Sequence, residues 1–248
     1  MMTLPADHPA FSEEIANKEA ERIITKYNTN IKSNHLMLTN IRIKSLPQIP
    51  ESVKYLYANS TKIETITNPL PELHLLSLEL TPLTHIKTLP LTLKKLFLNN
   101  TRITELPSLP PKLLLLHVYS TKLQQLPSLP ASLQELWVNN TKIKTLPDLP
   151  NGLRTLWVYN TFLEELPPLP DSLEALQTHT THLIQRQPGE FMSSYIYRVN
   201  LYYEKQRVQT RNLLIKEELM TVVWNPDRVS KWLDGMDDHS FNILIGED

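Results

Sequence analysis

Leucine and other large apolar residues occupy fixed places in a 20-residue pattern that runs without insertion from about residue 33 to residue 184. One copy, residues 133–152, reads LQELWVNNTKIKTLPDLPNG, and the shared pattern is LxxLxVxxTxLxxLPxLPxx. A fixed period of this length is typical of a solenoid, in which each copy packs on its neighbours. No copy can bury its own apolar residues, so the eight copies are expected to form one cooperative unit.

Each copy divides into a strand half and a proline half. In the strand half, Leu136 and Val138 alternate with residues 135, 137 and 139, which points the apolar pair inward and the others outward. In the other half, Pro147 and Pro150 have a fixed φ and no backbone N–H, which favours an extended, polyproline-like return path. We therefore expect a parallel β-sheet on the concave face and extended arms on the convex side. The residues expected in the core of this copy are Leu133, Leu136, Val138, Ile143, Leu146 and Leu149.

The second and third copies depart from the pattern in their proline halves. Thr67 and Lys87 stand where the other copies have proline, and residues 68–71 (NPLP) shift the prolines by one position. We expect irregular curvature in this part of the solenoid.

Residues 1–32 precede the repeats and are expected to cover the open edge of the first strand. Apolar residues recur there at helical spacing and predict a helix over residues 9–28, with Ser12 as its N-cap. The apolar side of this helix comprises Phe11, Ile15, Ala16, Ile23, Ile24 and Tyr27.

Residues 185–248 follow the repeats and predict a second, mainly helical cap. The sequence QPG at residues 187–189 breaks the repeat, and helical spacing then connects Phe191 with Tyr203. A further helix is expected over residues 213–224, ending before Pro226, because the residue before a proline disfavours helical geometry. A third helix from residue 226 and a short strand near residues 241–245 complete the prediction. The fold class is thus an α/β solenoid with helical caps at both ends.

The period and the leucine spacing of residues 33–184 resemble the leucine-rich repeat family. The paired prolines, as in residues 126–130 (LPSLP), are similar to the repeats of secreted bacterial effectors. Such effectors often carry a ubiquitin ligase domain with a catalytic cysteine. This chain has no cysteine, so that activity cannot be carried over.

A column of threonines is the main departure from the family, which usually has asparagine at this position. A threonine hydroxyl can donate and accept hydrogen bonds, so a buried threonine can bond to backbone groups of the turn as asparagine does, with less reach. We interpret the column as architecture. Its members are Thr61, Thr81, Thr101, Thr121, Thr141, Thr161 and Thr181.

The C-terminal segment 213–238 resembles a short module found in proteins of large DNA viruses that infect amoebae. The whole chain is accordingly similar to a leucine-rich repeat protein of such a virus, for instance of the marseillevirus type. This resemblance implies a role inside an infected amoeba or in the virion, and it assigns no activity to any residue. The alternative is that Trp224 and Trp232 only seal the last repeat.

Composition narrows the possible functions further. The net charge is −1, which gives no bulk attraction to nucleic acid or acidic membranes. A column of cations follows the threonines, but acidic residues lie near it in sequence, and we do not expect nucleic-acid binding. The absence of cysteine suits a reducing compartment, and no signal peptide or long apolar run is visible, so we expect a cytoplasmic protein without a membrane segment.

Catalytic signatures are not apparent in the sequence. Four glycines cannot supply a phosphate-binding loop or a nucleophile elbow. His179 and His182 are too few for a zinc site, which takes three or four ligands. We therefore expect a non-enzymatic protein without cofactor or metal.

Aromatic residues recur at outward-facing positions of the predicted sheet. Large rings beside amides are typical anchors of protein interfaces, so we expect a host or viral protein partner to bind the concave face. Two alternatives remain open: the rings only stack on one another and stiffen the sheet, or the chain is a structural component that assembles with copies of itself. The expected partner-binding residues are Tyr57, Phe97, His117, Tyr119, Trp137, Trp157 and Tyr159.

Overall fold

The computed structural model describes residues 9–29, 34–178, 183–184, 187 and 189–223. The chain divides into two compact units, residues 1–200 and 201–248. The solenoid lies entirely in the first unit. In the described part of the chain, no helix is both long enough and apolar enough to cross a membrane.

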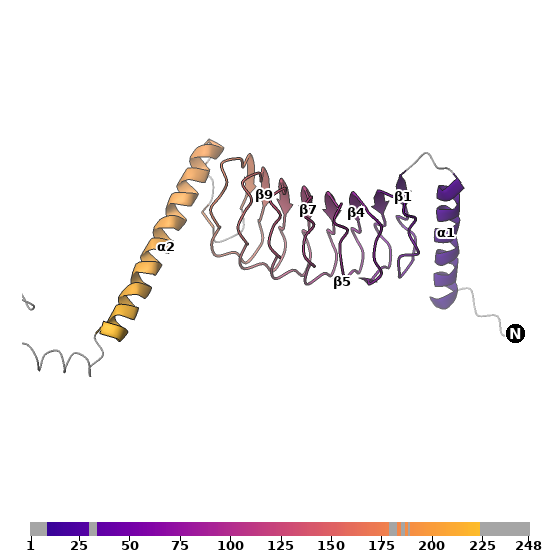
Figure 1. Ribbon diagram of the computed structural model, residues 1–248, viewed down its shortest axis with the longest axis horizontal. Coiled ribbons are helices and arrows are strands. Elements are labelled where there is room, and N and C mark those ends of the chain that lie inside the picture. The colour runs from indigo at the N-terminus through magenta and orange to yellow at the C-terminus, as the bar shows by residue number, and fades with distance from the viewer. Residues whose placement is uncertain (1–8, 30–33, 179–182, 185–186, 188, 224–248) are drawn as a thin grey trace, which may run out of the picture. The chain divides into compact units, whose positions relative to one another are not determined.

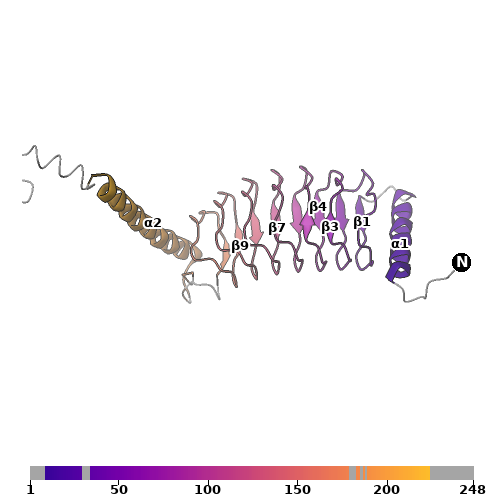
Figure 2. The same cartoon turned by 90° about the horizontal axis from the view of Figure 1, so that it is seen from below.

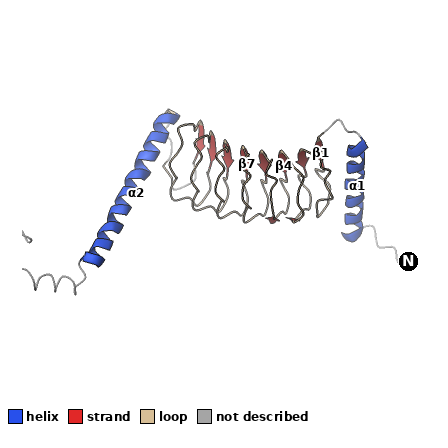
Figure 3. Ribbon diagram, in the orientation of Figure 1, coloured by secondary structure: helices blue, strands red, loops and turns tan. Residues whose placement is uncertain are grey.

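Eight parallel strands, one from each repeat, form the main sheet, in the order β1-β2-β4-β6-β7-β8-β9-β10. They lie along one side of the coil and the return arms along the other (Figures 1 and 3). This arrangement confirms the predicted parallel sheet. The strands are β1 (His35–Met37), β2 (Tyr55–Tyr57), β4 (Leu75–Ser77), β6 (Lys95–Phe97), β7 (Leu115–His117), β8 (Glu135–Trp137), β9 (Thr155–Trp157) and β10 (Ala175–Gln177).

The register of the sheet places equivalent residues of successive repeats side by side. Leu116 pairs with Leu136, and Leu136 with Leu156. Leu136, Val138 and Ile143 are fully buried as expected, but Leu146 and Leu149 are only half-buried. The predicted core of this copy was therefore too wide, because its convex arm forms the outer wall of the solenoid.

A second, two-stranded sheet joins the convex arms of the second and third repeats. It consists of β3 (Thr65–Ile66) and β5 (His85–Ile86), which pair in parallel. The backbone N–H of Lys87 donates to the carbonyl of Ile66 at 2.9 Å. A proline at residue 87, as in the regular repeats, could not make this bond. The departure of these two repeats from the pattern thus leads to extra strand pairing (Figure 2), and irregular curvature stays a prediction.

A sharp turn after each strand brings one residue into the left-handed region of backbone space. The residue before the threonine column has φ between 52° and 66° in seven described repeats. Asparagine tolerates this conformation better than branched or bulky residues do. The third repeat has Leu80 there, at φ 57°. The residues are Asn40, Ser60, Leu80, Asn100, Ser120, Asn140 and Asn160.

Helix α1 (Pro9–Thr29) covers the first repeat. Ala16 and Ala20 are buried, and the small alanine side chains allow the helix backbone to approach the repeat closely. Ile15, which we expected on the buried side, is 53% exposed. Ser12 lies inside the helix, so its predicted role as N-cap was wrong. An ion pair between Lys44 and Glu13, with Nζ and Oε2 2.6 Å apart, joins the helix to the first repeat.

Helix α2 (Met192–Val223) follows the last repeat as one continuous helix. We expected a break between two helices before residue 213, and this was wrong. Residues 204–212 (EKQRVQTRN) contain neither glycine nor proline and are mostly good helix formers. The third helix and the terminal strand predicted beyond residue 224 lie outside the described residues.

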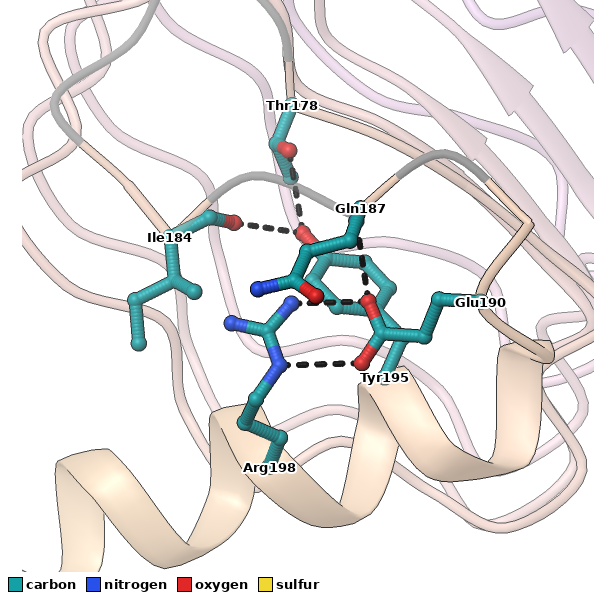
Figure 4. Close-up of polar contacts among 6 residues, drawn as sticks. All are labelled: Thr178, Ile184, Gln187, Glu190, Tyr195 and Arg198. Atoms are coloured by element: carbon teal, nitrogen blue, oxygen red, sulfur yellow. Dashed lines mark hydrogen bonds and ion pairs between the residues drawn. The ribbon is translucent and has the colours of Figure 1, made fainter.

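The first turns of α2 close the end of the solenoid through a polar network (Figure 4). The hydroxyl of Tyr195 donates to the carbonyl of Ile184 at 2.6 Å and lies 3.1 Å from the hydroxyl of Thr178. Arg198 binds both carboxylate oxygens of Glu190, at 2.9 and 2.8 Å. Two charge-assisted bonds of this kind hold a loop firmly against a helix.

Asn200 completes this closure by bonding to the backbone of the last convex arm. Its side-chain oxygen accepts from the N–H of Leu169 at 2.8 Å, and its amide nitrogen donates to the carbonyl of the same residue at 3.0 Å. Leu166 and Leu169 are buried here, unlike the equivalent leucines of the copy at residues 133–152. The start of α2 therefore supplies the packing that a following repeat would give.

Candidate functional site

The threonine column lies at the edge of the core, just after the left-handed turn. In each described member the hydroxyl donates to the backbone carbonyl three residues earlier, at 2.6–3.0 Å. These side chains are buried, so no solvent competes for the bond. The bonds hold each turn within its own repeat. Thr181 lies outside the described residues.

An aromatic stack runs along the concave face over four neighbouring strands. The rings of Trp137 and Trp157 are parallel, with centroids 3.9 Å apart. His117 stacks on the other face of Trp137, also at 3.9 Å, and Phe97 meets His117 edge to face at 4.9 Å. The sequence placed these four residues in one column, and the structure brings them into direct contact. The stacking that we considered as an alternative to binding is therefore present.

Two tyrosines extend the stack sideways. The ring of Tyr119 lies 6.1 Å from that of Trp137, and the ring of Tyr159 lies 6.4 Å from that of Trp157, both tilted. All four of these residues are half-buried. The stack and the two tyrosines form one patch, which we call the aromatic face.

Tyr57 stands apart from the aromatic face. Ser77 occupies the equivalent position of the repeat between Tyr57 and Phe97, and its small buried side chain interrupts the column. Tyr57 belongs instead to a second cluster with His35 and Tyr55, whose rings stack at 4.2 Å. His35 was not among the predicted partner-binding residues, although it shares the column of Tyr55.

His117 is the most buried ring of the stack, 8% exposed. Its Nε2 lies 3.1 Å from Oε1 of Glu135. Burial lowers the pKa of His117 below the ordinary 6.5, and the carboxylates of Glu135 and Glu79 oppose this only in part. The imidazole is therefore neutral at pH 7. Because a carboxylate only accepts, Nε2 carries the proton and donates to Glu135.

The asparagines beside the aromatic face are more buried than the alternation predicts. Asn99 and Asn139 are each 2% exposed, so the expectation that residue 139 faces solvent was wrong. The side-chain oxygens of Asn59 and Asn99 accept backbone N–H groups of the following repeat, those of Glu79 at 2.9 Å and Tyr119 at 3.2 Å. These bonds join the asparagine side chain of one repeat to the backbone of the next.

The predicted cation column is exposed along the edge of the solenoid, as expected from its position. Its members are Arg42, Lys62, Arg102, Lys122 and Lys142.

No group of three or more histidine, aspartate or glutamate side chains in the described residues is placed to hold a metal ion. A hollow of about 520 Å³ lies between the arms of the first two repeats, lined mainly by prolines and polar residues.

Comparison with known proteins is consistent with this architecture. No protein-family model and no curated protein sequence matches the chain. Among solved structures, the chain is similar to YopM, described as a leucine-rich effector protein, from Yersinia pestis, with a TM-score of 0.59 at 25% identity. It is also similar to YopM from Yersinia enterocolitica, with a TM-score of 0.53 at 25% identity.

The fold is a leucine-rich repeat solenoid. The similarity to the Yersinia pestis protein covers 70% of this chain and 56% of that protein. The similarity to the Yersinia enterocolitica protein covers 61% of this chain and 38% of that protein. The chain thus spans well under two thirds of either protein's length. Within the leucine-rich repeat fold, the aromatic face of this chain lies on the concave sheet.

Proposed function

We propose that this chain is a non-enzymatic protein-interaction module that binds a partner protein on its concave aromatic face. The single observation that carries the proposal is the stack of Phe97, His117, Trp137 and Trp157, flanked by Tyr119 and Tyr159. Large rings supply much contact area with few rotatable bonds, which is why they dominate interface energetics.

The stack also prepares these rings for binding. Neighbouring rings 3.9 Å apart hold each other in one rotamer before any partner arrives. Binding to an ordered side chain costs less conformational entropy than binding to a mobile one. Stacking and binding are therefore compatible: the ring faces support one another, and the ring edges remain for the partner. His117 contributes by stacking on one face of the Trp137 ring and holding it in place.

The C-terminal resemblance gives the proposal its biological setting, a viral protein that acts on a host or viral partner. Most of the resembling segment lies beyond the described residues. The test is an affinity capture from amoeba lysate with the folded chain and with the double variant Trp137→Ala/Trp157→Ala. We expect a partner that binds the natural chain and not the double variant.

Matched controls separate binding from folding. The variant Leu91→Ala/Phe162→Ala removes two exposed apolar side chains elsewhere and should capture the partner normally. The variant Tyr119→Ala/Tyr159→Ala removes two rings of the aromatic face but leaves the parallel stack in place, and it should also lose the partner. Equal capture by all variants would refute the concave-face proposal.

Self-association is the second candidate function, and helix α2 favours it. Tyr197, Leu201, Tyr202 and Val208 of this helix are exposed, which is unusual for large apolar side chains on one helix. Sedimentation velocity at rising concentration decides between the two functions. A mass that stays at one chain excludes assembly, whereas a mass that rises and returns to one chain in Tyr197→Glu/Tyr202→Glu supports it.

A further inference from the structure

Asn139 is the exception among the buried asparagines of the concave face. Its side-chain oxygen is shielded from solvent and has no hydrogen-bond partner. Asn59 and Asn99, at the same position of other repeats, both accept a backbone N–H twenty residues later in the chain. The same residue type at the same position is thus satisfied twice and left unsatisfied at the centre of the aromatic face.

Trp137, two residues earlier on the same side of the strand, has the complementary defect. Its indole Nε1 is also shielded and unpaired. Nε1–H is a donor and the Asn139 oxygen is an acceptor. In the described part of the chain, these are the two buried side-chain polar atoms without a partner. A buried donor or acceptor without a partner destabilises the fold, so native proteins rarely leave one unpaired without a functional reason.

Tyr119 and Tyr159 flank this donor and acceptor. The parallel register places them at the equivalent positions of the repeats before and after Asn139. The pKa of Tyr119 is raised mainly by burial, then by Glu79 and by Tyr159, so the Tyr159 hydroxyl lies close enough to affect it. Neither ring is part of the parallel stack, and each makes a tilted contact with a tryptophan instead.

The same region carries two carboxylates without a cation. Glu135 accepts from the neutral ring of His117, and Glu79 accepts from the amide of Asn99 at 2.5 Å. Within the described residues, no lysine or arginine lies at ion-pair distance from either carboxylate. A partner that approaches this region therefore meets negative charge beside aromatic rings, which favours a basic side chain.

We infer that the aromatic face binds an extended peptide segment of its partner, with the C=O and N–H of one residue of that segment paired to Trp137 Nε1–H and the Asn139 oxygen. A basic side chain of the same segment lies beside Glu79 and Glu135. Tyr119 and Tyr159 move aside to admit it. This inference rests on the proposed function and deepens it by naming the chemistry of the partner.

One residue of an extended segment fits because its own C=O and N–H, an acceptor and a donor, point to the same side of the segment. Its carbonyl oxygen accepts from Nε1 and its N–H donates to the Asn139 oxygen, so one residue of the segment satisfies both unpaired atoms. A basic side chain supplies only donors and could not satisfy Nε1. Carboxylates beside an extended backbone then select the side chain.

The experiment selects short random peptides displayed on phage against the full chain and discards those that also bind Trp137→Ala/Trp157→Ala. The tightest peptide is synthesised with each backbone amide N-methylated in turn, and dissociation constants are measured by titration calorimetry. We expect one methylation to weaken binding about tenfold, because it removes the N–H that Asn139 accepts. In Asn139→Ala the same methylation should have almost no effect.

The matched control is Asn99→Ala, in which the methylation penalty should remain as in the natural chain. Replacing the basic residue of the peptide with glutamine should weaken binding to the natural chain and have less effect on Glu135→Gln. The inference is overturned if the penalty survives in Asn139→Ala, if no methylation matters, or if the selection yields no peptide. A peptide that depends on the tryptophans but not on Asn139 would refute this pairing and leave the proposed function intact.

Discussion

At the scale of single residues, the turn after each strand is the most constrained feature of the repeat. Leu80 holds a left-handed backbone that costs a residue with a bulky side chain of the order of 1 kcal/mol. Its side chain is 61% exposed, so packing does not compensate for the strain. The equivalent residues in neighbouring repeats are serine and asparagine.

Leu80→Asn should therefore stabilise the chain by about 0.5–1 kcal/mol. Urea unfolding followed by circular dichroism measures the change. The reverse exchange at an equivalent position, Asn100→Leu, should destabilise by a similar amount. A destabilised Leu80→Asn would show that the leucine side chain makes a contact that outweighs the backbone strain.

The threonine column gives the second prediction at this scale. Thr121→Val keeps the shape of the side chain but removes the 2.8 Å bond to the Val118 carbonyl. The buried carbonyl loses its side-chain donor, so the free energy of unfolding should fall by about 1–2 kcal/mol. Thr104→Val, at an exposed threonine, is the control and should change little. Equal stability of the two variants would mean that the column contributes no net hydrogen-bond energy.

At the scale of elements, the aromatic stack spans four strands and contains one titratable ring, that of His117. The folded chain holds the pKa of His117 below 6.5 by burial, whereas the unfolded chain does not. As pH falls below 6.5, His117 binds a proton in the unfolded chain but stays neutral in the folded chain. The free energy of unfolding therefore falls. The loss stops growing once pH passes below the folded pKa.

His117→Gln should remove this contribution. We expect the difference in unfolding free energy between the natural chain and the variant to be constant above pH 6.5 and to move against the natural chain below it. Urea titrations over a series of pH values provide the measurement. A difference that does not change with pH, or that favours the natural chain on acidification, would contradict the assignment of a lowered pKa.

At the scale of the whole molecule, the solenoid is a stack of nearly equivalent neighbours. Deleting residues 81–100 removes one complete repeat and joins two strands that have the same register. The shortened chain should fold and unfold in one cooperative transition at a lower urea concentration, because it has one interface fewer. Deleting only residues 81–90 should abolish folding, because the leucines no longer meet their equivalents. Cooperative unfolding of the half-repeat deletion would contradict nearest-neighbour stacking.

The sequence alone determined the period, the parallel sheet, the position of each strand and the column that contains the aromatic stack. This was possible because every repeat contacts its neighbours at equivalent positions, so the core position of Leu136 follows from the pattern of its own copy. The same reasoning placed Trp137 beside Trp157. The pattern of the repeats does not determine how much of either side chain is exposed to solvent.

Only the tertiary structure decided which polar groups lack a partner and where the solenoid ends. Asn59, Asn99 and Asn139 occupy the same position of their repeats, yet of these three only Asn139 has an unpaired side-chain oxygen. The difference depends on the rotamers of several neighbouring repeats at once, which a single repeat does not specify. The closure by Asn200 likewise pairs it with Leu169, 31 residues earlier in the chain, a contact that no local period encodes.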